Sequence, residues 1–220
     1  MLEVRGLARS YGREALFEGV DLDVAAGEWV AIVGESGSGK STLLNVIAGI
    51  DRPDAGNVSL AGQRLDYADD DALAAYRRAH VGFVFQAFHL LPYLDVEENV
   101  ALPLALLGEP RHARLERARA LLEAVGLAGF GARRPASLSG GEAQRTAIAR
   151  AVVHSPRLLL ADEPTGNLDE ATAAVVLDTL ANAVRQSNAA AVMVTHSSIA
   201  AARADRVLRL SQGHLRPATP

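Results

Sequence analysis

The stretch WVAIVGESGSGKST, residues 29–42, decides the fold. The apolar run WVAIV predicts a buried strand, and GESGSGKS matches G-x-x-x-x-G-K-[ST] directly after it, where the helical pattern STLLNVIAG begins. The glycines let the backbone curl so that successive N–H groups point at an anion, at a helix N-terminus whose dipole favours negative charge. A plain flexible turn would not need this strand–loop–helix order. We therefore predict a loop that binds the phosphates of a nucleotide.

The basic residue of this loop is unusual for the chain. Lys40 is the only lysine among 22 basic side chains, and all the others are arginine. A compact ammonium suits a loop folded tightly around phosphates better than a broad guanidinium does. We expect Lys40 to reach the β- and γ-phosphates and the Ser41 hydroxyl to bind Mg²⁺. The predicted nucleotide-binding residues of the loop are Gly34, Glu35, Ser36, Gly37, Ser38, Gly39, Lys40, Ser41 and Thr42.

A second apolar run, RLLLADE at residues 157–163, ends in two carboxylates. An acid at such a strand end can hold Mg²⁺ in phosphoryl-transfer sites, and a neighbouring carboxylate can activate the attacking water. Asp162 is the predicted metal contact and Glu163 the predicted base. An acid in this place can instead cap the next helix. The phosphate loop upstream favours the metal and catalytic roles.

The segment LSGGE, residues 138–142, opens a helix and permits two interpretations. Ser139 and Glu142 have the spacing of a capping box. Gly140 and Gly141 are poor helix formers, but they suit a backbone that must approach an anion closely. From these residues alone, both a plain helix cap and a second phosphate-binding surface remain open.

Together these motifs resemble the ATP-binding-cassette (ABC) ATPases, and the resemblance covers essentially the whole chain. The phosphate loop, LSGGE, LLLADE, GNLD at 166–169 and TH at 195–196 occur in the order found in that family. The resemblance implies hydrolysis of ATP with Mg²⁺ by a head-to-tail pair of copies. Each copy would hold ATP against the LSGGE segment of the other.

The resemblance also implies roles for single residues. Tyr11 would stack on adenine, Gln86 would contact Mg²⁺ and water, and His196 would hold the γ-phosphate and orient Glu163. The implied metal contacts are Ser41, Gln86 and Asp162. The residues implied to reach the nucleotide of the other copy are Ser139, Gly140, Gly141, Glu142 and Asp169. On their own, Tyr11, Gln86 and His196 would be read as a surface aromatic, a strand end and a structural histidine. Glu142 departs from the family pattern, where glutamine is commoner.

Alternating apolar strands and helical patterns predict an α/β fold with a mainly parallel sheet covered on both faces. Residues 1–30 and 57–66 have polar-alternating strands and turn glycines, which predict an antiparallel flap. The predicted strands of the parallel sheet lie at 29–34, 81–86, 157–163, 190–196 and 205–210.

The middle of the chain is nearly all helical in pattern. We expect one ABC ATPase domain over residues 1–220, built on a P-loop NTPase core. Its core lobe would comprise about 1–87 and 155–220, and an inserted α-helical lobe would comprise about 88–154.

Composition limits the partners and the location. A net charge of −4 argues against binding nucleic acid by bulk electrostatics, and the arginines of RHARLERAR at 111–119 predict a solvated helix face. There is no cysteine, so disulfides and cysteine metal sites are excluded. The longest apolar run, residues 100–107, is broken by Pro103 and is far shorter than the ~20 residues of a spanning helix. We expect a cytoplasmic protein that reaches the inner face of the membrane only through a separate permease.

The ABC ATPases that this chain resembles include transporters and proteins with other functions. Members that act in DNA repair or chromosome organisation separate the phosphate loop from the LSGGE segment by long coiled coils, and no sustained heptads occur here. Ribosome-associated members resemble two fused cassettes, whereas this chain has one. Glu163 and His196 oppose a module that binds nucleotide without hydrolysis. The segment FQAFHLLPYLDVEENVALPL, residues 85–104, is similar to the lipoprotein-releasing, macrolide-exporting and cell-division subgroup of transporters.

Overall fold

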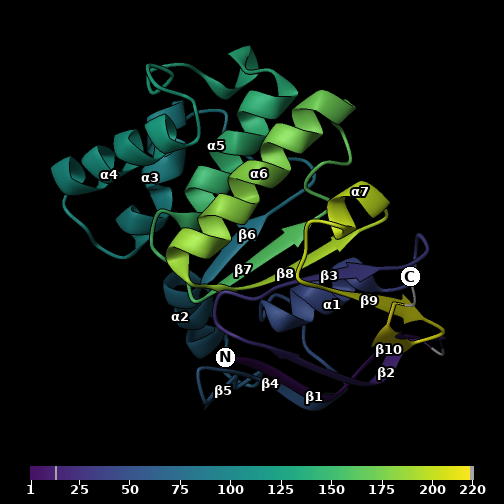
Figure 1. Ribbon diagram of the computed structural model, residues 1–220. Helices are drawn as coiled ribbons and strands as arrows, with labels where there is room; N and C mark the ends of the chain where they lie inside the picture. Colours follow the sequence, from purple (N-terminus) through teal and green to yellow (C-terminus); the bar gives the residue numbers. More distant parts are fainter. Residues whose placement is uncertain (13, 219–220) are drawn as a thin grey trace.

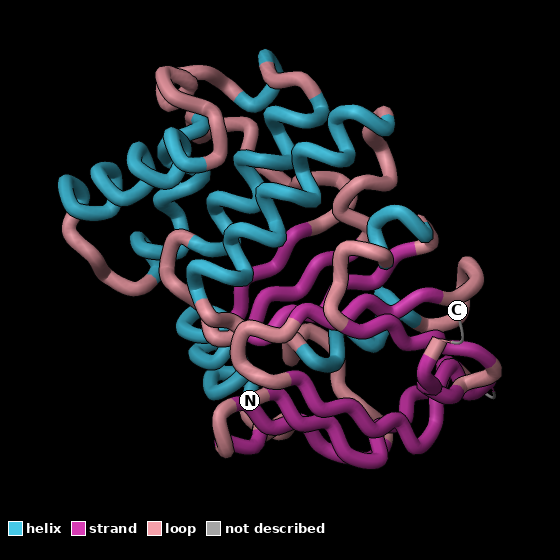
Figure 2. Tube along the Cα trace, in the orientation of Figure 1, coloured by secondary structure: helices cyan, strands magenta, loops and turns pink. Residues whose placement is uncertain are grey.

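The computed structural model describes residues 1–12 and 14–218. The strands form two sheets, and helices pack against them (Figures 1 and 2). The strands are β1 (Leu2–Tyr11), β2 (Glu14–Val24), β3 (Trp29–Val33), β4 (Ala55–Leu60), β5 (Gln63–Arg64), β6 (Val81–Val84), β7 (Leu158–Asp162), β8 (Ala190–Thr195), β9 (Arg206–Ser211) and β10 (His214–Pro217). The helices are α1 (Lys40–Ile47), α2 (Asp70–His80), α3 (Val96–Leu106), α4 (Arg111–Ala124), α5 (Gly140–Val152), α6 (Glu170–Ser187) and α7 (Ser198–Ala201), with a 3₁₀ turn at Pro135–Ser137.

The two sheets differ in strand direction. The smaller sheet has the order β2-β1-β4-β5 and is antiparallel throughout. The larger sheet has the order β10-β9-β3-β8-β7-β6 and is parallel except for β10, which pairs antiparallel with β9. The predicted α/β fold, with a mainly parallel sheet and an antiparallel flap near the N-terminus, is confirmed.

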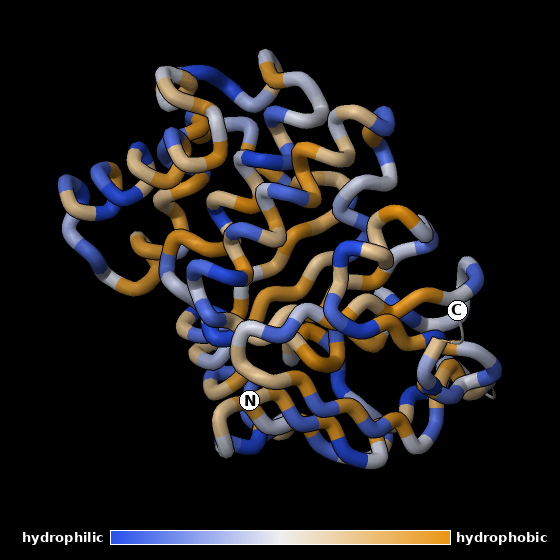
Figure 3. The backbone as a smooth tube through the Cα atoms, viewed as in Figure 1, coloured by the Kyte–Doolittle hydropathy of each residue, from blue (hydrophilic) through white to orange (hydrophobic). Residues whose placement is uncertain are grey.

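Burial explains the two strand patterns. Helix α1 lies between the sheets, and its apolar residues join those of both sheets in one core. Helices α5, α6 and α7 cover the other face of the parallel sheet and form a second core with it. Strands covered on both faces need continuous apolar sequence, and the central strands show continuous hydrophobic colour in Figure 3. The partly exposed strand β1 alternates buried and exposed residues at its start.

Helices α3, α4 and α5 enclose a third cluster of buried side chains, which lies apart from the sheets. Asp95 caps α3 in a capping box with Glu98, so the helix begins where the chain leaves the preceding loop. Within the described residues, no helix combines the length and the apolar character that crossing a bilayer requires.

Helix α2 was not predicted from the sequence pattern. Leu73 is its one buried residue and Tyr76 packs partly buried against the core, so few apolar side chains mark this helix in the sequence. Local interactions define it instead: Asp69 accepts hydrogen bonds from the backbone N–H groups of Asp71 and Ala72. Acidic residues in its first turn and basic residues in its last turn complement the helix dipole.

Candidate active site

Four neighbouring strands of the parallel sheet bring the predicted residues to one edge. The phosphate loop follows β3, His196 follows β8, Asp162 ends β7 with Glu163 next to it, and Gln86 follows β6. Parallel strands end at the same edge of a sheet, and ligands of such sheets bind outside their carboxyl ends. The sequence order of the motifs is therefore converted into a spatial group by the strand order β3-β8-β7-β6.

The glycines of the phosphate loop each have a geometric reason. Gly37 and Gly39 have φ angles of 79° and 92°, in the left-handed region that glycine adopts without strain. A Cβ atom on Gly34 would lie 2.5 Å from the carbonyl oxygen of Leu210. No described side chain caps the start of α1, so its first backbone N–H groups are left for a ligand.

Lys40 is buried, and its ammonium points back into the loop. Its Nζ donates to the carbonyl oxygens of Gly34 at 3.0 Å and Glu35 at 2.7 Å. The Ser38 hydroxyl is buried nearby and has no hydrogen-bond partner among the described residues. A buried hydroxyl without a partner is costly, so the Ser38 hydroxyl suits a hydrogen bond to an incoming phosphate. The Lys40 ammonium suits the same phosphate through its charge.

The predicted metal contacts Ser41 and Asp162 lie together. The Ser41 hydroxyl donates to the Asp162 carboxylate at 3.0 Å, although the two residues come from the start of α1 and the end of β7. Burial raises the pKa of Asp162, and the hydrogen bond from Ser41 opposes that shift. A hydroxyl and a carboxylate in contact are oxygen ligands of the kind that Mg²⁺ prefers.

Glu163 and His196 form the pair expected from the resemblance. His196 Nδ1 lies 2.9 Å from Glu163 Oε1, and the His196 backbone N–H donates to Glu163 Oε2 at 3.3 Å. Glu163 has a φ of 46°, a left-handed conformation that costs a non-glycine residue about 1 kcal/mol or more. The Glu163 side chain is 14% exposed and that of His196 67%, so the carboxylate is held inside while the ring faces outward.

Gln86 is attached to the loop that follows β7. Its side-chain amide donates to the Asn167 side chain at 3.5 Å, and Asn167 donates back to the Gln86 carbonyl at 3.3 Å. A Cβ on Gly166 would lie 2.9 Å from Gln86 Nε2, so this glycine leaves room for the amide. No described hydrogen bond joins Gln86 to Ser41 or Asp162.

The predicted capping box of the LSGGE segment is confirmed. The Ser139 N–H donates to Glu142 Oε2 at 2.8 Å, and the Glu142 N–H donates to Ser139 Oγ at 3.4 Å. The bond from the Ser139 backbone is the main cause that lowers the pKa of Glu142. Ser139 and Glu142 are therefore hydrogen-bonded to each other at the start of α5.

The structure gives Gly141 a packing reason that the sequence did not reveal. A Cβ at Gly141 would lie 2.3 Å from Thr172 Cγ2, so glycine is needed for the close approach of α5 and α6. This packing reason stands beside the two interpretations that the sequence left open for the paired glycines. At Gly140 the nearest atom would be Leu168 Cδ2 at 3.1 Å, the end of a flexible side chain.

Asp169 lies at the start of α6, next to the start of α5. Its carboxylate accepts a hydrogen bond from the Thr172 backbone N–H at 3.1 Å and caps α6. Hydrogen bonding to Thr172 is also the largest cause that lowers the Asp169 pKa. Because Thr172 also contacts Gly141, the structure brings Asp169 together with the LSGGE segment.

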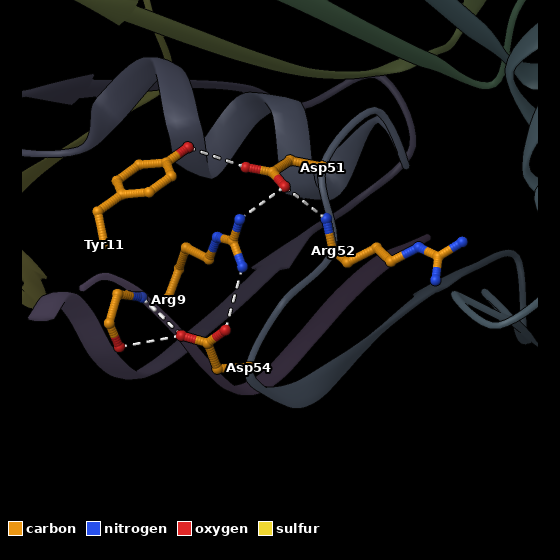
Figure 4. Close-up of polar contacts among 6 residues, drawn as sticks. Arg9, Tyr11, Asp51, Arg52 and Asp54 are labelled. Carbon is orange, nitrogen blue, oxygen red and sulfur yellow. Dashed lines mark hydrogen bonds and ion pairs between the residues drawn. The ribbon is translucent and has the colours of Figure 1, made fainter. Parts of the chain in front are cut away.

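Tyr11 makes its contacts with Arg9 and Asp51, away from the phosphate loop (Figure 4). Its hydroxyl donates to Asp51 at 3.1 Å, and the Arg9 guanidinium lies 5.1 Å from the ring centroid. Asp51 follows the C-terminal end of α1, whereas the phosphate loop precedes the N-terminal end. No described contact joins Tyr11 to the loop. Arg9, Asp51 and Asn167 were not predicted, because their contacts join segments that are distant in sequence.

The site residues thus form two groups. The first group comprises the phosphate loop with the Ser41–Asp162 and Glu163–His196 pairs. A hollow of about 640 Å³ is lined by Gly34, Glu35 and His196 and otherwise mainly by residues of α7 and β9. Ser139, Glu142 and Asp169 form the second group at the starts of α5 and α6. No described contact joins Ser139 to the phosphate loop.

Comparison with known proteins identifies the family. The family model described as "ABC transporter" matches residues 17–166. This chain belongs to the ABC transporter family. The lipoprotein-releasing system ATP-binding protein LolD of Chromohalobacter salexigens is 49% identical over 98% of this chain and 92% of that protein. The macrolide export ATP-binding/permease protein MacB 1 of Yersinia pestis bv. Antiqua is 45% identical over 98% of this chain and 34% of that protein.

A solved structure supports the fold and the activity of this ABC chain. The dimeric ATP-binding cassette MJ0796, in a post-hydrolysis state bound to ADP and Pi, superposes with a TM-score of 0.88 at 35% identity. The match covers 100% of both chains. The chain is an ATP-binding cassette with the fold of an ABC ATPase, and its predicted similarity to lipoprotein-releasing and macrolide-exporting members is confirmed.

Proposed function

We propose that this ABC ATPase pairs with a second copy of itself around two ATP molecules and drives a separate membrane permease, of the lipoprotein-release or macrolide-export type. The carrying observation is the separation of the site into two groups within one chain. A nucleotide held by the phosphate loop of one copy is completed by Ser139 of the other. The dimeric state of MJ0796 with ADP and Pi, and the names of the LolD and MacB relatives, support this arrangement.

The two lobes divide this work. Residues 1–87 and 155–220 form the core lobe, which holds the phosphate loop and the catalytic pair. Residues 88–154 form the helical lobe, which ends in α5 and carries Ser139 at the start of that helix. Support comes from the separate cluster of buried side chains that α3, α4 and α5 enclose.

Oxygen ligands for Mg²⁺ are available beside the loop. Ser41, Asp162 and Gln86 would hold the ion, with the Gln86 amide no longer bonded to Asn167. Mg²⁺ supplies neutralisation of the phosphate charge that develops during transfer. The contact between the Ser41 hydroxyl and the partly buried Asp162 carboxylate fits this donor set.

The residues of the catalytic pair have separate tasks. Glu163 accepts a proton from the attacking water, and His196 keeps the carboxylate oriented through its ring and its backbone N–H. Lys40 exchanges the carbonyls of Gly34 and Glu35 for phosphate oxygens, which carry more negative charge and form stronger hydrogen bonds with the ammonium.

The residues of the second group act on the nucleotide of the other copy. The Ser139 hydroxyl gives up the Glu142 N–H and turns to the γ-phosphate, so pairing opens half of the capping box. Gly140, Gly141 and Asp169 line the same surface. Tyr11 provides the stacking surface for adenine within its own copy.

Force passes to the permease through the segment that follows Gln86. A groove of about 320 Å³ lies between α2, β6, α3 and α5, with Phe83, Pro103 and Leu106 in its lining. Elements of both lobes line it, so closure of the lobes changes its shape. The permease occupies this groove and holds the ATPase at the inner face of the membrane.

Replacement of Glu163 by Gln tests the catalytic assignment and the pairing together. The amide keeps the shape of the pocket but cannot accept a proton, so turnover falls by about a hundredfold or more. With ATP bound and not hydrolysed, the variant protein then accumulates as a stable dimer. Size-exclusion chromatography with and without ATP measures this dimer. Glu123→Gln, an exposed acid of α4, is the matched control and leaves turnover and the monomer unchanged. Full turnover in Glu163→Gln would discard Glu163 as the base, and a monomer that never pairs would discard the composite site.

A further inference from the structure

The segment after Gln86 has an unusual backbone. Phe88 and His89 are consecutive and have φ angles of 61° and 46°. Both are in the left-handed region, which is unfavourable for residues with a Cβ and a true outlier for a bulky side chain. Such conformations persist only where the surrounding structure holds them. The cause of this conformation therefore lies outside the segment.

Arg150, in the last turn of α5, holds both residues. Its Nη2 donates to the Phe88 carbonyl at 2.7 Å and its Nη1 to the His89 carbonyl at 2.5 Å. The planar guanidinium offers two donors in a fixed fork, which matches two successive carbonyls pointing the same way. Arg150 is in no ion pair among the described residues. These two carbonyls are its described hydrogen-bond partners.

Other contacts bind the same segment to α5. The Gln144 side chain donates to the Phe85 carbonyl at 3.5 Å, and the Phe85 ring packs on His89 with centroids 4.7 Å apart. The tip of the Phe88 ring lies 3.9 Å from the place where a Cβ of Gly140 would be. Phe88 thus contacts α5 near its last turn through its carbonyl and at its first turn through its ring.

Gln86 is therefore placed between two attachments. Its side chain and carbonyl are bonded to Asn167 in the core lobe, and the residues that follow it are bonded to the helix that starts at Ser139. A displacement of Gln86 toward bound nucleotide would move the Phe88–His89 carbonyls and, through Arg150, the whole of α5.

We infer that Arg150 is a positioning residue that fixes the Gln86 segment to α5, so that Gln86 and Ser139 move as one unit when two copies close on ATP. This inference rests on the proposed function. Arg150 acts through its hydrogen bonds to the Phe88 and His89 carbonyls. It sets the conformation of the two residues that connect Gln86 to the helical lobe.

The first test is Arg150→Met in the full chain. The phosphate loop is untouched, so Kd for ATP in the monomer stays within about twofold, while kcat falls about tenfold because closure no longer aligns the two groups. Hydrogen exchange of residues 86–90 becomes faster than in the unchanged protein. The matched control is Arg117→Met, because Arg117 also donates to a backbone carbonyl, that of Val153 at 2.7 Å just after the same helix. The control keeps its kcat.

A glycine rescue separates positioning from mere support. Glycine adopts positive φ freely, so His89→Gly in the Arg150→Met background restores about a third or more of the lost turnover. Arg150→Lys gives an intermediate kcat, since one ammonium lacks the planar fork. A merely structural arginine would lower the unfolding temperature without any rescue by glycine.

His89→Val covers the case in which Arg150→Met does not fold. His89 is exposed, and a β-branched residue resists positive φ, so kcat falls while the unfolding temperature changes little. The inference is overturned if Arg150→Met folds and keeps full kcat, if His89→Gly gives no rescue, or if His89→Val turns over normally. The proposed function fails separately, when the unchanged chain itself does not hydrolyse ATP.

Discussion

Two helices of this chain begin at glycine-rich segments, and their N-termini are built differently. At the start of α1, Gly39 has a left-handed conformation and no described side chain caps the helix. At the start of α5, Ser139 and Glu142 cap each other in both directions. The first N-terminus is left open for an anion, whereas the second is closed within the single chain. We infer that the first binds nucleotide in a monomer, and that the second opens only when a second copy presents its nucleotide.

The largest effect is expected at the open helix start. Lys40→Arg places a broad guanidinium where a buried ammonium now bonds two loop carbonyls, and we expect turnover to fall by roughly a thousandfold with a matching loss of ATP affinity. Steady-state ATPase assays and titration with a fluorescent ATP analogue measure the two losses. Wild-type turnover would contradict the steric argument, and Arg64→Lys on the exposed strand β5 controls for exchange of the cation.

At the start of α5 we expect a loss of turnover without a matching loss of ATP affinity. Ser139→Ala removes one donor to the phosphate of the other copy, and we expect turnover to fall by about a hundredfold. Affinity for ATP in the monomer stays within about twofold, since the phosphate loop is intact. The same assays applied to Ser137→Ala, an exposed serine of the preceding turn, give unchanged values. Equal losses of affinity and turnover at Ser139 would show that the two helix starts do not differ in the inferred way.

The glycines at the two helix starts show how far the sequence could be read. The conformations of Gly37 and Gly39 follow from a local motif, so the turn between β3 and α1 could be predicted from residues 34–41. The need for glycine at Gly141 comes from Thr172, which lies on another helix. No local pattern contains that contact, and the sequence interpretation gave the position an anion-binding reason instead.

The same limit explains the rest of the fold and site. Central strands were predicted because burial on both faces leaves a continuous apolar run, whereas α2 was not, because most of its residues are polar or charged. The Ser41–Asp162 contact and the Gln86–Asn167 contact join residues that only the strand order of the sheet brings together. The motifs predicted candidate site residues, and the fold was needed to show their partners.

A methyl group at Gly141 should therefore act on stability. In Gly141→Ala the new Cβ meets Thr172 Cγ2, and we expect a loss of about 1–3 kcal/mol in the free energy of unfolding from overpacking. Denaturant unfolding measures it. Thr172→Ser removes the opposing methyl group and should recover most of the loss in the double variant. Gly140→Ala meets only the movable end of Leu168 and should cost less. An equal cost at both glycines would show that helix propensity, and not the contact with α6, decides.

The smallest effect concerns the acid that closes the second helix start. Hydrogen bonding to the Ser139 N–H lowers the pKa of Glu142 below its ordinary value of 4.5, so the folded chain holds the proton less tightly than the unfolded chain. The carboxylate therefore stabilises the fold above that value, and the contribution is lost as the pH falls through the lowered pKa. In Glu142→Gln the amide oxygen still accepts the Ser139 N–H but does not titrate. Because the group is close to solvent, we expect a difference of less than about 0.5 kcal/mol at pH 7.

Unfolding of both proteins at several pH values measures this difference. The small advantage of the glutamate protein should disappear as the pH falls below 4.5 and through the lowered pKa of Glu142, while the glutamine protein keeps its cap throughout. Glu123→Gln on α4 controls for the loss of one negative charge away from any helix start. Parallel stability curves of wild type and Glu142→Gln would mean that the carboxylate adds nothing to the cap. In that case the closure of α5 would rest on Ser139 alone, and the contrast with the open start of α1 would reduce to a single hydroxyl.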